Sequence, residues 1–247
     1  MHEDIWPGFH ATEERCIWVP DSDTIVIADL HLGYEGVLRL DGVAMPRYQD
    51  HIIHDRLAKI LDRFGPRKVI INGDFKHNFS RNLQQEWREV SEMLSFLTDK
   101  CDVLIIRGNH DNYLKTIAVR YDVPLTWHYE LQGVTITHGH RTEDLPDSQR
   151  LLLAHEHPFV KLRDEVGATL SMPCYLYTDE VAILPAFSPI VSGTDVSDAS
   201  PHDYLSPLLH DINVDSFKVT AISDVGLLDF ATIGDLKDIH RQRAQNI

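Results

Sequence analysis

The chain has 247 residues, of which 43% are hydrophobic and 25% are charged, and its formal net charge is -15. This length and composition are ordinary for a folded protein of one or two domains, which excludes a disordered or fibrous chain. The negative charge disfavours broad attraction to nucleic-acid phosphates, so any contact with DNA has to be local.

The cysteines and the hydropathy exclude further classes. Cys16, Cys101 and Cys174 are odd in number and far apart, which argues against a disulfide framework or a structural zinc site. No apolar stretch approaches the length of a membrane helix, and the first residues lack the basic and apolar pattern of a secretion signal. We therefore expect a cytoplasmic protein that does not enter a membrane.

The first half of the chain alternates predicted strands with predicted helices. Short β-branched runs favour strands, apolar residues three and four positions apart favour helices, and Gly65-Pro66 is a helix stop. In chain order the predicted elements are strands at 15–20 and 24–30, helices at 30–40 and 46–64, a strand at 68–72, a helix at 83–98 and a strand at 102–106. This strand, helix, strand rhythm is typical of a parallel sheet.

The second half is richer in β structure. Predicted strands lie at 123–131, 133–137, 150–154, 172–185 and 217–230. We expect two facing sheets with helices outside, in one domain spanning 1–247, because the polar clusters of the chain have to converge. The segment 187–215 is rich in Ser, Pro, Asp and Gly and is long for an idle connection, so it either covers the site or forms a surface excursion.

Five short polar clusters each follow an apolar run that predicts a strand. They are Asp29-x-His31, Gly73-Asp74-x-x-His77, Gly108-Asn109-His110-Asp111, His138-Gly139-His140 and His155-x-His157. In open α/β sheets, ligands bind beyond the carboxyl ends of the strands, so these clusters occupy the place of a binding site. Asp, Asn and His side chains together are suited to divalent metals, and the pattern predicts a two-metal hydrolytic site.

In this order the five clusters resemble the signature motifs of the calcineurin-like metallophosphoesterase superfamily, over residues 24–158. The resemblance implies an α/β fold, a four-layered α/β/β/α sandwich with a dinuclear metal site at the carboxyl ends of the strands. More narrowly, the stretches 28–35, 73–77, 184–189 and 192–195 resemble archaeal phosphoesterases related to SbcD, the exonuclease subunit of break repair.

The resemblance also implies a ligand set. Asp74 is expected to bridge two metals, with Asp29, His31 and His157 completing one shell and Asn109, His138 and His155 completing the other. His140 is the alternative to His138, which the family pattern favours. Two anionic ligands leave two divalent ions with roughly two positive charges, enough to attract a phosphoester, and a shared deprotonated water is the expected nucleophile. Manganese is the first choice of metal, with iron or zinc as alternatives.

Two further histidines are candidate catalytic residues. His110 is expected to stabilise or protonate the leaving oxygen. His77 stands where many phosphatases of the superfamily carry Asp, whereas the repair nucleases resemble this chain in having His, which favours phosphodiester substrates. Asp111 is expected to orient His110 or, with more weight, to cap the helix that follows.

The sequence therefore predicts a metal-dependent phosphoester hydrolase, a phosphodiesterase or nuclease acting on single-stranded or duplex DNA. Cations expected near the phosphate are Lys76, Arg81 and Arg141, together with Arg39 and Arg47. The alternatives are a small-molecule phosphomonoesterase or cyclic-nucleotide-type phosphodiesterase, favoured by the acidic composition and the lack of an aromatic and basic stripe, and a non-catalytic scaffold. A homodimer is left open, because related repair nucleases dimerise.

Overall fold

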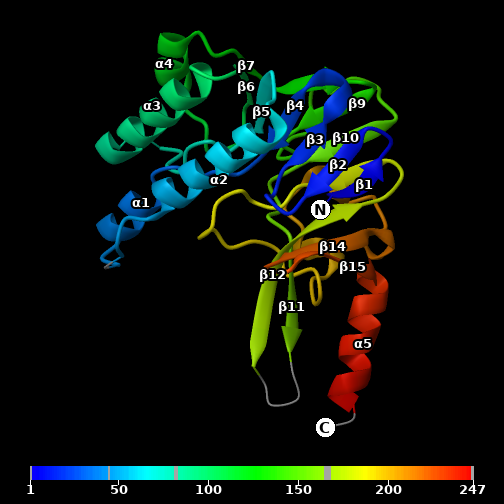
Figure 1. The fold of residues 1–247 in the computed structure, drawn as a ribbon. Helices are drawn as coiled ribbons and strands as arrows, with labels where there is room; N and C mark the ends of the chain where they lie inside the picture. Colours follow the sequence, from blue (N-terminus) through cyan, green and yellow to red (C-terminus); the bar gives the residue numbers. More distant parts are fainter. Residues whose placement is uncertain (1, 44, 81–82, 164–167, 246–247) are drawn as a thin grey trace.

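Two β-sheets lie face to face at the centre of the fold in a computed structural model, which describes residues 2–43, 45–80, 83–163 and 168–245 (Figure 1). The first sheet has the strand order β1 to β7 without interruption. Its strands are β1 His2–Trp6, β2 Phe9–Thr12, β3 Ile17–Val19, β4 Thr24–Ile27, β5 Lys68–Asn72, β6 Asp102–Ile106 and β7 Leu125–Thr126. The strands β4, β5, β6 and β7 are parallel, as the alternation of strands and helices predicted.

The second sheet has the order β15-β14-β12-β13-β10-β9-β8, and β11 pairs with β12. Its strands are β8 His128–Leu131, β9 Val134–Thr137, β10 Arg150–Leu153, β11 Phe159–Arg163, β12 Thr169–Tyr177, β13 Val181–Ile183, β14 Lys218–Ser223 and β15 Gly226–Thr232. The neighbours β9, β10 and β13 are parallel, so each sheet contains a parallel section.

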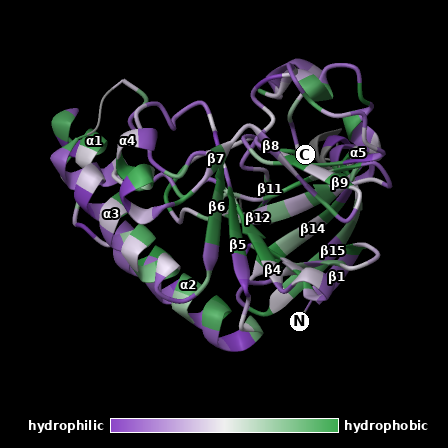
Figure 2. Ribbon diagram, turned by 90° about the horizontal axis from the view of Figure 1, so that it is seen from above, coloured by the Kyte–Doolittle hydropathy of each residue, from purple (hydrophilic) through white to green (hydrophobic). Residues whose placement is uncertain are grey.

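Helices cover the outer face of the first sheet (Figure 2). They are α1 Tyr34–Leu40, α2 Gln49–Phe64, α3 Gln84–Thr98 and α4 Lys115–Ala118. The apolar stripe Ile53, Leu57 and Ile60 of α2 is fully buried in the cluster that also holds the strand residues Ile25 and Ile27. No helix in the described ranges is long and apolar enough to cross a membrane.

A second apolar cluster joins the two sheets. Val26 and Ile70 of the first sheet share it with Ile136 and Leu152 of the second. The far face of the second sheet is covered by the start of α5 Ile233–Gln245 and by the segment 187–215. The described residues also include short 3-10 turns at Pro20–Ser22, Val119–Tyr121, Pro201–Asp203, Pro207–Leu209 and Val214–Ser216. The predicted pair of facing sheets flanked by helices is thereby confirmed.

Several element boundaries differ from the prediction. The stretch 123–131 is two strands rather than one, with β7 at the edge of the first sheet and β8 at the edge of the second. The predicted strands 172–185 and 217–230 are likewise two strands each, and the helix predicted from residue 46 begins at Gln49. The hairpin of β1 and β2, the strand β11 and the helix α5 were not predicted.

Candidate metal centre

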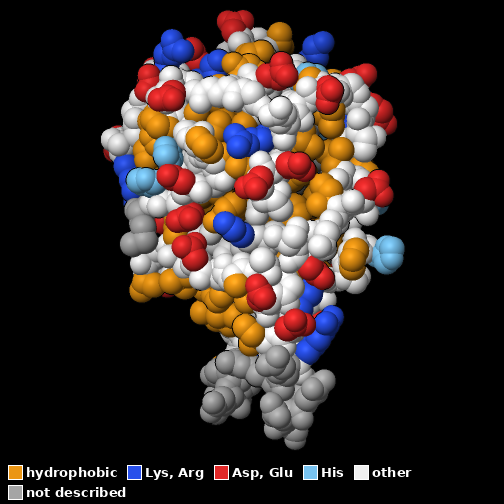
Figure 3. All heavy atoms as spheres, turned by 90° about the vertical axis from the view of Figure 1, so that its right-hand side faces the viewer, with side chains coloured by type: hydrophobic (Ala, Val, Ile, Leu, Met, Phe, Trp, Pro, Cys, Tyr) orange, Lys and Arg blue, Asp and Glu red, His pale blue; other side chains and the backbone are white. Residues whose placement is uncertain are grey.

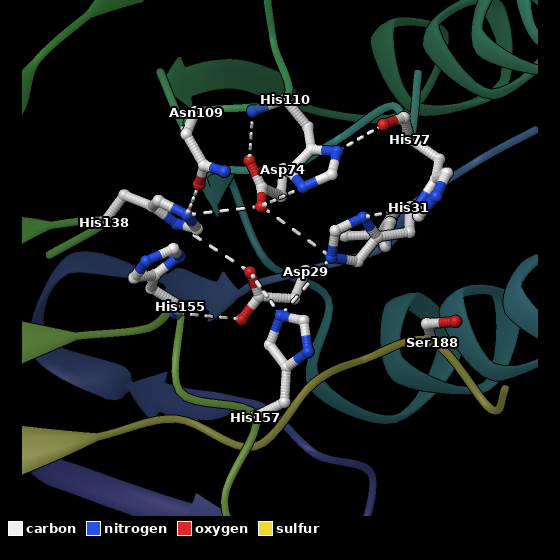
Figure 4. Close-up of polar contacts among 12 residues, drawn as sticks. Asp29, His31, Asp74, His77, Asn109, His110, His138, His155, His157 and Ser188 are labelled. Carbon is white, nitrogen blue, oxygen red and sulfur yellow. Dashed lines mark hydrogen bonds and ion pairs between the residues drawn. The ribbon is translucent and has the colours of Figure 1, made fainter. Parts of the chain in front are cut away.

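The five polar clusters meet at one place, where the carboxyl ends of parallel strands from both sheets come together (Figure 4). Asp29 follows β4, Asp74 follows β5 and Asn109 follows β6 in the first sheet. His138 follows β9 and His155 follows β10 in the second sheet. The arrangement is the one expected of ligand sites in α/β sheets, and here two sheets contribute to it.

The backbone at this site adopts a conformation that side-chain-bearing residues rarely take. Positive φ angles occur at Asp29 (57°), His31 (48°), Asp74 (46°), His155 (72°) and His157 (46°). Such residues cost free energy in isolation and persist where the surrounding structure holds them. The first two loops hold each other, because the Asp29 N–H donates to the Gly73 carbonyl at 3.1 Å and the His31 N–H donates to the Asp74 carbonyl at 2.9 Å.

Two groups of potential ligand atoms share the Asp74 carboxylate. The first group consists of Asp29, His31, Asp74 and His157, and the second of Asp74, His138 and His155. Within each group the ligand atoms lie within 4.8 Å of one another. Asn109 adjoins the second group, because its Oδ1 lies 3.3 Å from His138 Nε2. The seven residues expected as ligands therefore lie together at one place.

Hydrogen bonds at the back of the rings fix which nitrogen faces the site. His138 Nδ1 lies 3.0 Å from the Asn72 carbonyl and His157 Nδ1 lies 2.9 Å from the Ser192 carbonyl. A carbonyl can only accept, so each Nδ1 carries a proton and donates, and each neutral ring keeps a lone pair on Nε2. This is how the histidine ligands of metals are usually oriented.

The donor set at the centre fits divalent cations. His157 Nε2 lies 3.2 Å from Asp29 Oδ1 and 3.3 Å from His31 Nε2, so the neutral His157 ring turns a lone pair towards the Asp29 carboxylate. His138 Nε2 lies 3.4 Å from Asp74 Oδ2, where a proton takes the place of a cation when no metal is bound. Asp29 Oδ1 is buried and accepts no hydrogen bond from the residues that the structure describes. Buried lone pairs that converge in this way are stabilised by a positive charge between them.

Proton affinities show the same demand for positive charge. Burial alone would lower the pKa of His138, but Asp74 and Asp29 raise it to about 10. At His155, burial and the neighbouring His138 lower the pKa to about 4. The protein without metal therefore holds a proton on one imidazole of the second group and leaves the other neutral.

His110 and His77 lie beside the centre but interact differently from the expectation. His110 Nδ1 donates to the backbone carbonyl of His77, and His110 Nε2 lies 4.0 Å from Asp74 Oδ2. The His77 ring turns away, stacked on Tyr34 at 3.9 Å between centroids, with its Nδ1 3.1 Å from His31 Nδ1. His77 thus orients His110 through its carbonyl and His31 through its ring.

Three glycines bring the backbone close to ligand residues. A Cβ atom on Gly73 would lie 2.1 Å from His138 Nδ1, and one on Gly108 would lie 2.1 Å from Asp74 Oδ1. A Cβ on Gly193 would lie 1.9 Å from the His157 carbonyl oxygen. Only glycine fits at these positions without moving a ligand residue.

The segment 187–215 lies against the centre. The Ser188 N–H donates to the Asp29 carbonyl at 3.1 Å, and Figure 4 shows Ser188 beside the centre. Glu156, between the last two histidines, is fully buried and accepts from the Ser206 N–H at 2.6 Å, the Leu205 N–H at 3.1 Å and the Thr194 hydroxyl at 3.1 Å. The segment is thus tied to the ligand loop, and Glu156 is a positioning residue that the sequence analysis missed.

Asp111 has a different role from the one expected. Its carboxylate accepts from the Gly108 N–H at 2.8 Å and the Phe75 N–H at 2.9 Å, so it joins the loops after β6 and β5. It caps no helix, since α4 begins at Lys115 with Leu114 at the cap position. His140 is half-buried and belongs to neither metal group among the described residues, whereas His138 belongs to the second.

The cations expected at the substrate are mostly engaged elsewhere. Lys76 is fully buried with its ammonium 3.6 Å from the Glu86 carboxylate, so its expected phosphate contact is wrong and its role is structural. Arg141 pairs with Glu143 at 3.1 Å and stacks over Trp127 at 4.3 Å.

Two of the remaining three expected cations are paired with side chains of α3. Arg47 pairs with Glu89 at 3.0 Å and Arg39 donates to Gln85, so both face α3. Arg81 lies outside the described residues.

Comparisons with known proteins agree with this geometry. The family model for calcineurin-like phosphoesterases matches residues 23–216. The nuclease MPE of Pseudomonas putida has a similar structure, with a TM-score of 0.67, 20% sequence identity, and coverage of 90% of this chain and 94% of that one. The phosphoesterase Yfce of E. coli is 16% identical over 86% of this chain and 94% of its own, with a TM-score of 0.40. None of the curated proteins matches the chain.

The family match extends over all five polar clusters and most of the two sheets. The structural likeness to the Pseudomonas nuclease supports the same fold independently. The chain therefore belongs to the calcineurin-like phosphoesterase family and is a hydrolase that acts on phosphoester bonds.

Proposed function

We propose that the centre hydrolyses phosphodiesters with two divalent cations, manganese foremost, held by the seven residues Asp29, His31, Asp74, Asn109, His138, His155 and His157. The observation that carries this proposal is the sharing of Asp74 by two ligand groups, each of which is completed by imidazoles. When bound, the cations would supply Lewis acidity and a water acidic enough to act as nucleophile at neutral pH.

The charge of the ligand set suits a phosphoester. Asp29 and Asp74 are the anionic members, and Asn109 contributes an oxygen without charge. Two divalent ions would therefore leave the centre with roughly two positive charges, which attract a substrate with an anionic phosphate. Mixed imidazole and carboxylate donors are compatible with manganese, iron and zinc.

His110 is the proposed acid for the leaving oxygen. Its Nδ1 proton is held by the His77 carbonyl, so Nε2 is the ring nitrogen that faces Asp74. Its side chain is 24% exposed, so a substrate can reach it beside Asp74. Many phosphatases of the superfamily have a carboxylate as the partner of this histidine, whereas here the partner of His110 is the His77 carbonyl. This difference agrees with the preference for diesters suggested by His77.

The kinship with SbcD-related archaeal phosphoesterases is part of the proposal. The two C-terminal stretches that carry this resemblance both contact the centre. Within 184–189, the Phe187 N–H donates to the Ala28 carbonyl at 2.8 Å beside the Ser188 bond to Asp29. Within 192–195, Gly193 packs against His157.

A second candidate function is hydrolysis of small phosphomonoesters. The net charge of -15 favours it, because a polyanionic strand is repelled by most of the surface. The face in Figure 3 shows this balance, with more Asp and Glu than Lys and Arg side chains.

The decisive experiment compares substrates on metal-stripped protein reloaded with manganese. The substrates are bis-p-nitrophenyl phosphate, p-nitrophenyl phosphate and single-stranded DNA, and the variants are His110→Asn and the exposed His51→Asn as a matched control. We expect metal-dependent diester hydrolysis that falls by about 10²–10⁴-fold in His110→Asn with metal content unchanged. Hydrolysis of the monoester alone would overturn the proposal in favour of the second candidate, and no hydrolysis by loaded protein would favour a scaffold.

The expected cytoplasmic location is also kept as a proposal. Cys16 and Cys174 are buried and Cys101 is half-buried, and all three are free thiols. Unpaired cysteines are typical of reducing compartments. Fractionation of the source cells with an antibody against the chain would test this location.

A further inference from the structure

A pocket of about 490 Å³ lies beside β7, close to the metal centre but separate from it. Arg107, Tyr113, Lys115 and Trp127 are among the residues that line it. Arg107 stands two positions before Asn109 in the chain. The Trp127 ring lies 6.2 Å from that of His140, which is 5.3 Å from that of His138, so a row of rings connects the pocket with the second ligand group.

Arg107 has no anionic partner in the described part of the chain. Its guanidinium lies 4.3 Å from the centroid of Trp127, and its Nε is buried without a hydrogen-bond acceptor. Buried donors without acceptors are costly, so this group is suited to an anion supplied from outside. An arginine without a carboxylate partner is unusual in a chain with 38 acidic and 23 basic residues.

The other charges of the pocket leave it positive. Lys115 is exposed on the rim, and Asp122 is the one carboxylate among the lining residues. Arg141 also lies 4.3 Å from the Trp127 centroid, but its guanidinium is paired with Glu143 and Asp144. Arg141 therefore supports the indole, and Arg107 is the residue with donors to spare.

On the basis of the proposed diester hydrolysis, we propose that this pocket binds a neighbouring phosphate of a single nucleic-acid strand. A simple monoester has no second phosphate to fill such a site, whereas a strand presents one on either side of the bond that is cut. Tyr113 lines the same pocket with 58% of its surface exposed and offers an aromatic face to a base. Cations and aromatic rings together are the usual means of binding single strands.

These residues form no stripe in the sequence, because 107 and 113 lie in the connection between β6 and α4, 115 begins α4, and 127 follows β7. Folding brings them together on the β7 edge of the first sheet, where the helix α4 stands beside β7 in Figure 1. A local cationic pocket of this kind resolves the conflict between a strand substrate and an acidic surface.

The test compares Arg107→Gln with Arg120→Gln as a matched control. The Arg120 guanidinium also stacks on an indole, because it lies 4.9 Å from the centroid of the Trp87 ring. Binding of a fluorescein-labelled oligothymidylate is measured by anisotropy on manganese-loaded protein in the His110→Asn background, at several salt concentrations. We expect Arg107→Gln to weaken binding by about tenfold and to reduce the salt slope by about 0.7, the value for one phosphate contact on a single strand.

Hydrolysis gives a second readout with His110 intact. In Arg107→Gln the ratio of kcat/KM for the oligonucleotide to kcat/KM for bis-p-nitrophenyl phosphate should fall by about tenfold, and in Arg120→Gln it should stay constant. An unchanged ratio, or oligonucleotide binding equal to that of Arg120→Gln, would overturn the pocket assignment while leaving diester hydrolysis intact. Absence of all diester hydrolysis would instead defeat the proposed function, and the anisotropy would still report on the pocket.

Discussion

If the centre holds two metals as proposed, replacement of Gly73 by alanine should remove one of them. The new Cβ would lie 2.1 Å from His138 Nδ1 and 2.4 Å from its Cγ, whereas an ordinary contact begins at 3.4 Å. The buried imidazole would therefore have to retreat by about 1.3 Å, the difference between the two distances. Metal–ligand distances tolerate changes of about 0.2 Å, so the displaced His138 could no longer bind its metal.

The size of the effect can be bounded. Loss of a single outer partner of a metal ligand typically costs about 10–100-fold in metal affinity, and displacement of the ligand itself should cost at least as much. The positive φ of Gly73, 85°, adds roughly 1–2 kcal/mol of backbone strain for any L side chain. Gly65→Ala is the matched control, because Gly65 also has a positive φ of 53° but nothing lies within 4 Å of its Cβ position.

The assay is metal content by mass spectrometry after dialysis against limiting manganese, together with urea unfolding and hydrolysis of bis-p-nitrophenyl phosphate. Gly65→Ala should lose stability but keep two metals per chain. Gly73→Ala should keep one metal and lose most of its activity. If Gly73→Ala binds both metals with the affinity of the control, His138 is not a ligand or does not pack against Gly73, and the reasoning is wrong.

Three further outcomes are expected. Gly193→Ala should weaken binding of the metal in the first group and leave binding in the second group unchanged, because the new Cβ would lie 1.9 Å from the His157 carbonyl oxygen. Equal loss of both metals would contradict this. Manganese affinity should rise about tenfold per pH unit between pH 7 and 9, because the pKa of His138 is raised to about 10 and its proton must leave before the metal binds. Calorimetry in buffers of different ionisation enthalpy measures the affinity and the released proton. An affinity that does not change with pH would contradict this role of His138. Lys76→Met should lower the free energy of unfolding in urea by about 3–5 kcal/mol, because the buried Glu86 carboxylate loses its cation. KM for the diester should stay within twofold. A large rise in KM would mean that Lys76 contacts the substrate after all.

The positions of the polar clusters could be predicted because each one follows a strand with a strong signal. The strands before Asp29, Asp74 and Asn109 are short β-branched runs, and the predicted bounds of β5 and β6 match the structure. Parallel strands present their carboxyl ends on the same edge, so the convergence of these side chains follows from the topology.

The division of 123–131 between two sheets was not predictable from periodicity alone. Leu125–Thr126 and His128–Leu131 read as one run, and only the pairing partners decide that the chain passes from one sheet to the other at Trp127. The missed hairpin of β1 and β2 did carry a local signal, because Pro7-Gly8 marks a turn and Gly8 has a φ of 78°.

The roles of charged side chains were the least predictable part of the site. Lys76 lies beside a ligand in the sequence, yet burial and Glu86 remove it from the substrate. Conversely, Glu156 and Arg107 belong to no recognisable motif. The hydrogen-bond donors of Glu156 lie 38 to 50 positions away in the sequence, and the ring on which Arg107 stacks lies 20 positions away. Such long-range partners are fixed by tertiary structure rather than by neighbouring residues.

The supply of ligand residues by both sheets has a mechanical consequence. Aspartate and asparagine come from loops of one half of the sandwich and most imidazoles from the other, so each ion of the proposed centre would cross-link the halves in addition to its chemical task. At a free concentration one hundred times the dissociation constant, one such ion contributes about 2.7 kcal/mol to the resistance against unfolding. Chelation of the metals should therefore weaken the contact between the two halves. The metal supply in the cell would then set the lifetime of the folded chain as well as its catalytic rate.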